Sequence, residues 1–257
     1  MPQTRFSFLG VPLDAYSTNE ILEKIKKYIN TPSGFVHIVS INPENVVIAQ
    51  QNNLFRTVCG ESSLALCDGI GVLIGARMLG IPLEMRTQGS VLFPQLLDLA
   101  GQMSLSVLLV GSQANLAEDI AKCYQRSYPK AKFTGLQGYQ NISKPTPEEE
   151  EALLSIVNAT RPRIVFAAFG SPSQELWFYS HKHLFKDMIC MGVGGGFNYL
   201  SGASKRPNRY IRQLGLEWLY RLVTEPKRFQ RQMTRLPVFV GMLIKEKIYG
   251  KKSRDRS

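Results

Sequence analysis

The chain has 257 residues, of which 44% are hydrophobic and 20% charged; this composition is typical of a folded globular protein and excludes wholesale disorder. The net charge is +11, and the excess lies in residues 201–257, which hold 15 Lys/Arg and four Asp/Glu, whereas residues 1–200 hold 16 of each. A neutral body with a basic end predicts a polyanionic partner there, such as nucleic acid, anionic lipid or a pyrophosphate group. A merely solvated tail is the alternative, and the aromatic residues within the tail, Trp218 and Phe239 among them, argue against it.

The sequence also predicts a compartment. No apolar run approaches the roughly 18 residues that a membrane-spanning helix needs, and the first residues lack the apolar stretch of a signal peptide. The four cysteines are scattered without a Cys-x-x-Cys pair, which indicates neither a disulfide framework nor a zinc knuckle. We therefore expect a reduced, cytosolic compartment.

The first hundred residues predict two helices and two strands. Residues 18–28 read as a helix capped by Thr18 or Asn19, and residues 35–41 as a strand. Asn42-Pro43-Glu44 then opens a helix, because proline fits the first helical turn. Residues 63–67 read as a short strand that ends at Asp68-Gly69.

From residue 105 onward, strands and helices alternate. The apolar runs 105–110, 131–134, 164–169 and 188–193 read as strands, and residues 115–127, 147–159 and 173–184 as helices. Continuous apolar strands that alternate with helices indicate a parallel sheet covered on both faces. We therefore predict an α/β fold with a doubly wound, Rossmann-like, mostly parallel sheet. Residues 202–208 read as a linker, so we divide the chain into an α/β domain of residues 1–200 and a basic helical appendage of residues 201–257.

The appendage combines basic and apolar faces. Thr224 to Pro226 can cap and start a helix, in which Arg228, Arg231 and Arg235 share one face. Phe229, Met233 and Leu236 share another face, and the apolar residues 237–244 and several lysines follow. This pattern suits a helix lying on an anionic membrane. Docking of the apolar face on the body is an alternative that is compatible with the first.

Ligands of open α/β sheets bind beyond the carboxyl ends of the strands, where this chain places glycines, amides and few carboxylates. Glycines let the backbone approach phosphates and helix N-termini favour anions, so such a site can admit a nucleotide. Asp68 is the best candidate for a catalytic base, since it is an isolated carboxylate at a strand end followed by glycines. A base there can take the proton of a sugar hydroxyl, an effect of about 10²–10⁴-fold. The alternative is an ordinary Asp that starts a turn before Gly69.

Three weaker patterns predict no cofactor and no metal. The glycines at 192–196 fail the Gly-x-Gly-x-x-Gly pattern, because its last position falls on Phe197. His181 and His183 are two residues apart on a predicted helix and face different directions, so a metal pair is not expected. No Asp-x-Asp occurs, so the charge of a nucleotide-sugar pyrophosphate would be balanced by Arg, Lys and backbone amides.

The chain resembles the WecG/TagA/CpsF glycosyltransferases (glycosyltransferase family 26) over nearly its full length. The matching stretches are SINPENVVIAQQN, LCDGIGVLIGARMLG, RTQGSVL, VLLVGS, FGSPSQELW, GVGGGFNYLSG and LGLEWLYRLVTEPKRFQRQ. The resemblance implies transfer of a hexose, typically N-acetylmannosamine or its uronic acid, from a UDP-sugar to a polyprenyl-diphosphate-linked sugar. It implies inversion of the anomeric centre without a metal, in the synthesis of bacterial cell-surface polysaccharide or teichoic acid. It also implies a cytoplasmic enzyme that is peripheral on the inner face of the membrane.

The resemblance also implies roles for particular residues. Asp68 matches the proposed base; Ser40 and Asn42 match the Thr-x-Asn-Pro motif, with Ser40 keeping the hydroxyl; and Arg86 begins the motif that the family writes Arg-Val-Thr-Gly. Gln174 matches a glutamine near the transferred sugar. The further residues that we assign to substrate binding are Gly111, Asn198, Arg221, Arg228 and Arg231, the arginines lying near the diphosphates.

Three departures from the family pattern leave the donor sugar open, so that glucose and uronic-acid donors are kept as alternatives. Thr87-Gln88 replaces Val-Thr, and Val91 and Asn198 stand where Asp is common. A nucleic-acid-binding protein and a nucleotide-dependent oxidoreductase are the remote alternatives; we expect no nucleic-acid partner, and a homo-oligomer is left open.

Overall fold

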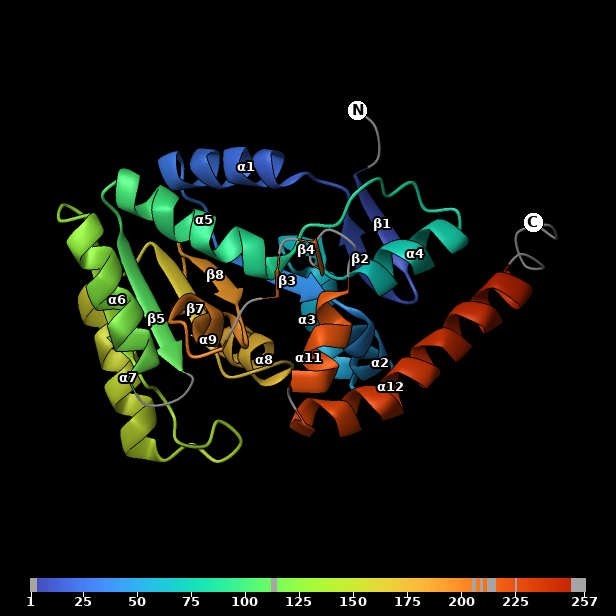
Figure 1. Ribbon diagram of the computed structural model, residues 1–257. Coiled ribbons are helices and arrows are strands. Elements are labelled where there is room, and N and C mark those ends of the chain that lie inside the picture. Colours follow the sequence, from blue (N-terminus) through green and yellow to red (C-terminus); the bar gives the residue numbers. More distant parts are fainter. Residues whose placement is uncertain are drawn as a thin grey trace.

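The computed structural model describes residues 4–111, 115–204, 207–208, 210–211, 216–224 and 226–250; for residues 221–224, 226–231 and 250 it describes the backbone alone. Within this part of the chain, eight strands form one sheet in the order β1-β2-β4-β3-β8-β7-β5-β6 (Figure 1). The strands are β1 (Arg5–Phe8), β2 (Val11–Asp14), β3 (Val36–Ile41), β4 (Leu64–Cys67), β5 (Ser106–Gly111), β6 (Lys132–Leu136), β7 (Ile164–Ala168) and β8 (Ile189–Gly192). β1 and β2 pair antiparallel, and the other neighbours pair parallel. The predicted α/β fold with a mostly parallel sheet is confirmed.

Both faces of the sheet are covered, which explains why its strands are apolar at successive positions. In β5, Val107 and Leu109 belong to one core, and Leu108 and Val110 belong to the core on the other face. The helices that contribute to the first core are α1 (Thr18–Asn30), α5 (Gly89–Gln102), α6 (Leu116–Ser127) and α9 (Gly196–Leu200). Those packed on the opposite face are α2 (Pro43–Gln51), α3 (Asn53–Glu61), α4 (Ile70–Met78), α7 (Pro147–Thr160) and α8 (Ser173–Ser180).

The structure corrects two predicted helix ends. The N-cap of α1 is Ser17, whose hydroxyl accepts a hydrogen bond from the backbone N–H of Glu20. The Glu20 carboxylate accepts from the Ser17 N–H in return, and this reciprocal capping outcompetes Thr18 and Asn19 as the start of the helix. Helix α8 ends at Ser180, whereas we predicted a helix to residue 184. His181 caps it, and residues 181–187 form turns that bring Phe185 into the core.

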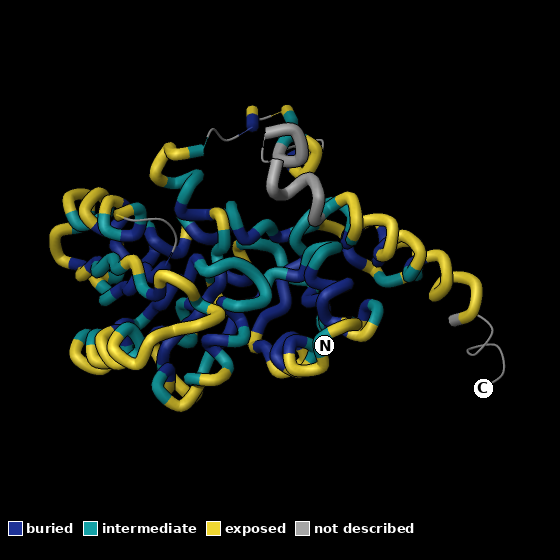
Figure 2. Tube along the Cα trace, turned by 90° about the horizontal axis from the view of Figure 1, so that it is seen from below, coloured by how far each residue is buried: buried dark blue, intermediate teal, exposed yellow. Residues whose placement is uncertain are grey.

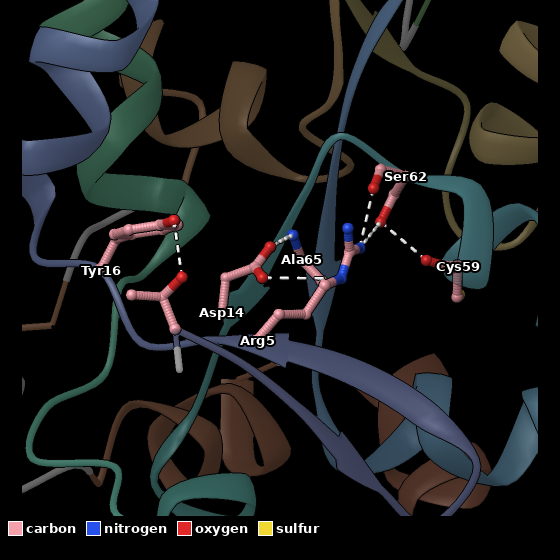
Figure 3. A network of polar contacts seen from close by, with 7 residues as sticks. Arg5, Asp14, Tyr16, Cys59, Ser62 and Ala65 are labelled. Atoms are coloured by element: carbon pink, nitrogen blue, oxygen red, sulfur yellow. Dashed lines mark hydrogen bonds and ion pairs between the residues drawn. The ribbon is translucent and has the colours of Figure 1, made fainter. Parts of the chain in front are cut away.

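The antiparallel hairpin of β1 and β2, which the sequence did not predict, is tied to the sheet by side chains (Figure 3). β2 meets β4 in the register Asp14↔Leu66. Asp14 Oδ2 accepts a hydrogen bond of 2.7 Å from the Ala65 N–H, and Arg5 forms an ion pair with Asp14. Arg5 also donates to the Ser62 carbonyl oxygen at 2.7 Å, so one arginine joins the edge hairpin to the segment before β4.

The C-terminal helices α11 (Glu217–Thr224) and α12 (Pro226–Lys245), followed by a π-helical turn η1 (Glu246–Gly250), lie against the carboxyl edge of the sheet and α2 (Figure 1). Phe239 and Leu243 of α12 are buried in the core formed with α2 and α4. Helix α12 begins at Pro226, as predicted, and continues through Pro237 into the segment that buries these two side chains. Figure 2 shows that its last turns run out from the body and are largely exposed. Among the described residues, no helix is both long and apolar enough to cross a membrane.

Candidate functional site

A pocket of about 740 Å³ lies at the carboxyl ends of four adjacent strands, β4, β3, β8 and β7. The lining includes the residues that directly follow three of these strands, Asn42, Asp68 and Val193, and Gly170, two residues after β7. Ser40 of β3 and Gly192 of β8 also line it. This is the edge at which the sequence predicted the ligand, and it is where parallel sheets bind ligands in general.

The pocket gathers most of the predicted site residues from distant parts of the chain. The predicted residues that line it are Ser40, Asn42, Asp68, Arg86, Gln174 and Asn198. Gly111 lies outside this lining, at the end of β5 beyond β7, and a Cβ atom at Gly111 would lie 2.7 Å from the Phe169 ring. The side chains of Arg221, Arg228 and Arg231 lie outside the described part of the structure. The structure brings six of the predicted residues together in one pocket, and the roles of all ten in catalysis and substrate binding stay predictions.

Gly89, the first residue of α5, leaves room between two of these side chains. A Cβ atom at this position would lie 2.7 Å from Ser40 Oγ and 3.6 Å from Asp68 Oδ2. The hydroxyl and the carboxylate therefore face the same small volume, and only a glycine leaves that volume open. The sequence analysis did not single out Gly89, because its role depends on how α5 meets the ends of β3 and β4.

Asn42 and Asn45 shape the floor of the pocket at the start of α2. Asn42 is the N-cap of α2, and its Oδ1 accepts a hydrogen bond of 2.9 Å from the Asn45 N–H. The buried Asn45 side chain donates to the Ser40 carbonyl oxygen at 2.6 Å and accepts from the Ser171 hydroxyl at 3.0 Å. These bonds join the end of β3 to the loop between β7 and α8.

Gln174 holds the next two loops together. Its Oε1 accepts hydrogen bonds from the backbone N–H groups of Gly170, at 3.2 Å, and Gly194, at 3.1 Å. Its Nε2 donates to Glu175 Oε1 at 2.7 Å, and a Cβ atom at Gly192 would lie 2.3 Å from Gln174 Nε2. Glu175 is fully buried, and burial raises the pKa of its carboxyl above the ordinary value.

Several helices begin at this pocket, among them α2, α4, α5 and α8, so several N-terminal ends of helix dipoles point toward it. Residues of the first turn or cap of α2, α4, α5 and α8 line the cavity. The N-caps of α4 and α5, Gly69 and Gln88, make no side-chain capping bond, and Gly69 has a φ of +93°, which favours glycine. Backbone N–H groups and dipoles arranged in this way attract an anionic group such as a phosphate.

The C-terminal helices complete the pocket on its other side. α11 contributes Glu217 and Trp218 to the lining, and α12 contributes Gln232, Arg235 and Leu236. Two contacts between described side chains show how these helices are connected to the body. The Gln88 side-chain amide donates to Glu217 Oε2 at 3.2 Å. The other contact is an ion pair between Arg235 and Glu44.

Sequence reasoning missed the roles of Glu217, Gln232 and Arg235 in this lining. The available signal for Arg235 was its position on one helix face with Arg228 and Arg231. Within the described residues, no cluster of three or more His, Cys, Asp or Glu side chains could hold a metal ion. His181 instead pairs with Glu150, with 2.5 Å between Nε2 and Oε1.

The fold and the pocket define a class: an α/β protein with a pocket at the carboxyl edge of its sheet, beneath C-terminal helices. The model of the WecG/TagA/CpsF family of glycosyl transferases matches residues 6–253. The chain belongs to this family and is a glycosyltransferase.

Two relatives illustrate this membership. An N-acetylglucosaminyldiphosphoundecaprenol N-acetyl-beta-D-mannosaminyltransferase from Bacillus spizizenii is 30% identical over 234 residues, covering 91% of this chain and 88% of the relative. A protein of the same name from Staphylococcus aureus is 29% identical over 251 residues, covering 97% of this chain and 96% of the relative.

Proposed function

We propose that this protein transfers a hexose of the N-acetylmannosamine type from a UDP-sugar to a polyprenyl-diphosphate-linked sugar, with inversion of the anomeric centre. The two relatives described above are named as N-acetylmannosaminyltransferases that act on N-acetylglucosaminyldiphosphoundecaprenol. They match this chain over nearly its full length. The observation that carries the proposal is the pocket, which combines the carboxylate of Asp68, several helix N-termini and exposed apolar side chains.

The floor of the pocket suits the donor. The diphosphate of a UDP-sugar is held by the helix N-termini and by Arg86, which lines the same cavity. Arg221, Arg228 and Arg231 on α11 and α12 are proposed to balance the leaving UDP or the lipid diphosphate. In this proposal, the charge of the diphosphates is balanced without a metal or another cofactor.

The mouth of the pocket suits a lipid-linked acceptor. Four of its lining side chains are apolar and at least a third exposed: Ile74, Leu216, Trp218 and Leu236. Leu236 begins an exposed apolar stripe of α12 that continues with Val240 and Ile244, and Lys245 and Lys247 follow. An exposed apolar stripe next to lysines suits the surface of an anionic membrane, so we propose peripheral binding at the cytoplasmic face.

Asp68 is proposed to act as the general base in a single displacement. The acceptor hydroxyl oxygen attacks the anomeric carbon while Asp68 takes its proton. The new glycosidic C–O bond forms as the bond to the UDP oxygen breaks, and UDP leaves with that electron pair. Because the attack comes from the face opposite UDP, the anomeric centre inverts.

The test is UDP release with a panel of UDP-sugars and a short-chain polyprenyl-diphosphate-GlcNAc acceptor, in the presence of EDTA. We expect release with UDP-N-acetylmannosamine and little release without acceptor. Release with UDP-glucose or a UDP-uronic acid instead would replace the donor in the proposal. A need for added divalent metal would contradict the metal-free mechanism. If no donor reacts, a repeat with a glucose-primed lipid separates a different acceptor from a different function.

A further inference from the structure

Glu175 places a carboxyl group under the pocket in a setting that does not suit a negative charge. Its side chain is 1% exposed, and its Oε1 accepts the hydrogen bond from Gln174 Nε2. Its Oε2 is buried and has no hydrogen-bond partner within the described part of the chain. A buried carboxylate is normally paired or bonded at both oxygens, so this arrangement requires an explanation.

The neighbouring hydrogen bonds have a fixed direction. Asn45 Nδ2 donates to the Ser40 carbonyl oxygen, which can only accept, and Asn45 Oδ1 is therefore the acceptor for the Ser171 hydroxyl. The Gln174 and Ser171 side chains favour the charged form of Glu175, but burial acts more strongly and raises the pKa of its carboxyl. A carboxylate would leave Oε2 buried and charged without a hydrogen-bond donor among the described residues, whereas the uncharged acid avoids that cost.

We propose that Glu175 works as an uncharged carboxylic acid that positions the pocket floor by orienting the Gln174 amide through its Oε1. Glu175 is a positioning residue in this proposal, because it acts through Gln174. Burial raises the pKa of its carboxyl, in agreement with the uncharged form.

Several contacts make the Gln174 orientation important for the pocket. Gln174 Oε1 joins the loops after β7 and β8 through Gly170 and Gly194, and both glycines line the pocket. The amide packs against Gly192 without room for a Cβ atom, so it has little freedom to move. If Glu175 loses its proton, its charged Oε2 attracts hydrogen-bond donors. Gln174 or Ser171 would have to rotate to supply one, and this rotation would break the hydrogen bonds of Gln174 to Gly170 and Gly194 or that of Ser171 to Asn45.

Two other titratable side chains, Cys59 and His37, lie close to α8, and both have pKa values shifted by burial. Cys59 of α3 interacts with Glu175, and burial raises the pKa of its thiol to about 12. His37 of β3 contacts Phe178 of α8, and burial lowers its pKa to about 3. Between these two values both groups are uncharged. Glu61 of α3 contacts the exposed Tyr179 hydroxyl.

The first test is infrared spectroscopy of the full-length protein without substrate. At neutral pH, the wild type is expected to show the carbonyl stretch of a protonated carboxylic acid, and Glu175→Gln is expected to lose it. Absence of this band from the wild type, or its persistence in Glu175→Gln, overturns the proposal. This arm uses no sugar and does not depend on the proposed reaction.

The second test is kinetic and rests on the proposed function. Glu175→Ala is expected to lower kcat by about tenfold or more, and Glu175→Gln, which mimics the uncharged acid, to restore most of that loss. As pH rises through the raised pKa of Glu175, the wild type is expected to lose activity and Glu175→Gln to lack this decline. If Glu175→Gln is as impaired as Glu175→Ala, or declines like the wild type, the proposal fails. Failure of all transfer by the wild type counts instead against the proposed function, and the infrared result stands.

Discussion

Asp68 directly follows β4 and shares with Ser40 the small volume that Gly89 leaves open. If it is the base, Asp68→Asn keeps the size of the side chain but cannot take the proton. We expect turnover to fall by about 10²-fold or more and affinity for UDP to stay nearly unchanged. Steady-state UDP release and calorimetric titration with UDP measure the two quantities. Unchanged turnover in Asp68→Asn would remove this carboxylate from the mechanism.

Gly89 gives a steric test of the same volume. The Cβ of Gly89→Ala would lie 2.7 Å from Ser40 Oγ, so the hydroxyl or the start of α5 must shift. We expect kcat/KM for sugar transfer to drop by at least about tenfold, while the thermal midpoint changes little. The matched control is Gly60→Ala on α3, where no atom outside the local helix backbone and the neighbouring residues lies within 4 Å of the added methyl group. Equal activity of both variants would show that this volume is not used.

The buried side chain of His37 is expected to make the free energy of unfolding depend on pH under acidic conditions. Burial lowers its pKa from 6.5 to about 3, so below pH 6.5 the unfolded chain binds a proton that the folded chain does not. This term therefore lowers the free energy of unfolding as pH falls from 6.5 toward 3, by at most about 1.4 kcal/mol per pH unit. Urea unfolding of the wild type and His37→Leu between pH 7 and 4.5 measures it. We expect a flatter pH dependence in His37→Leu and an unchanged one in the exposed control His183→Gln; equal slopes in all three would refute the assignment.

At the scale of elements, α12 has two apolar sides, one buried against the body and one exposed. Phe239 and Leu243 pack where α4 carries Gly71 and Gly75, and a Cβ atom at Gly75 would lie 2.8 Å from a Leu243 methyl group. Glycines four residues apart thus let the two helices approach closely. Val240 and Ile244, one position further along the chain in each case, are about half exposed. Docking on the body and an exposed apolar face coexist, but the docked side chains are Phe239 and Leu243, whereas Met233 of the predicted apolar face is 54% exposed.

This division predicts a sharp contrast between adjacent positions. Phe239→Ala removes a ring that is 2% exposed, whereas Val240→Ala trims a side chain that is 45% exposed. Loss of a buried Phe costs about 3–5 kcal/mol, so the docking of α12 should weaken markedly. Hydrogen exchange of the α12 amides is expected to accelerate in Phe239→Ala and to stay at the wild-type rate in Val240→Ala. Similar rates in both variants would mean that Phe239 does not hold the helix.

At the scale of the whole molecule, the charge imbalance and the pocket belong to one arrangement. The basic C-terminal segment supplies one wall of the pocket through α11 and α12 and exposes apolar side chains next to it. An acceptor held in a bilayer by its lipid would therefore reach the pocket from the side on which we propose that the protein binds the membrane.

Deletion of residues 201–257 tests this arrangement. We expect the truncated protein to leave anionic vesicles and to lose transfer to a lipid-linked acceptor, because a wall of the pocket and the basic surface are removed together. Vesicle co-sedimentation and UDP release measure the two effects, and circular dichroism checks that the α/β body is folded. Retained transfer to the lipid-linked acceptor would defeat this model of the appendage.

Much of the body could be predicted because its signals are local. The buried strands 105–110 and 164–169 are continuous apolar runs, and Asn42-Pro43 marks the start of α2. The β1–β2 hairpin escaped prediction because each strand has four residues and is tied to the sheet by Arg5 and Asp14. The sequence analysis also did not predict helices α3, α4 and α5. For α4 the reason is that its glycines, Gly71 and Gly75, resemble loop signals and are explained only by the packing of α12 against them.

The sequence by itself determined the alternation of strands and helices, and through it the edge of the sheet where Asn42, Asp68 and Gln174 meet. It could do so because burial of apolar strands and the direction of parallel strands follow from short segments. Only the tertiary structure decided that Gln88 meets Glu217, 129 residues away, and that Glu44 meets Arg235, 191 residues away. Contacts at such separations depend on how whole helices pack, and no local pattern encodes them.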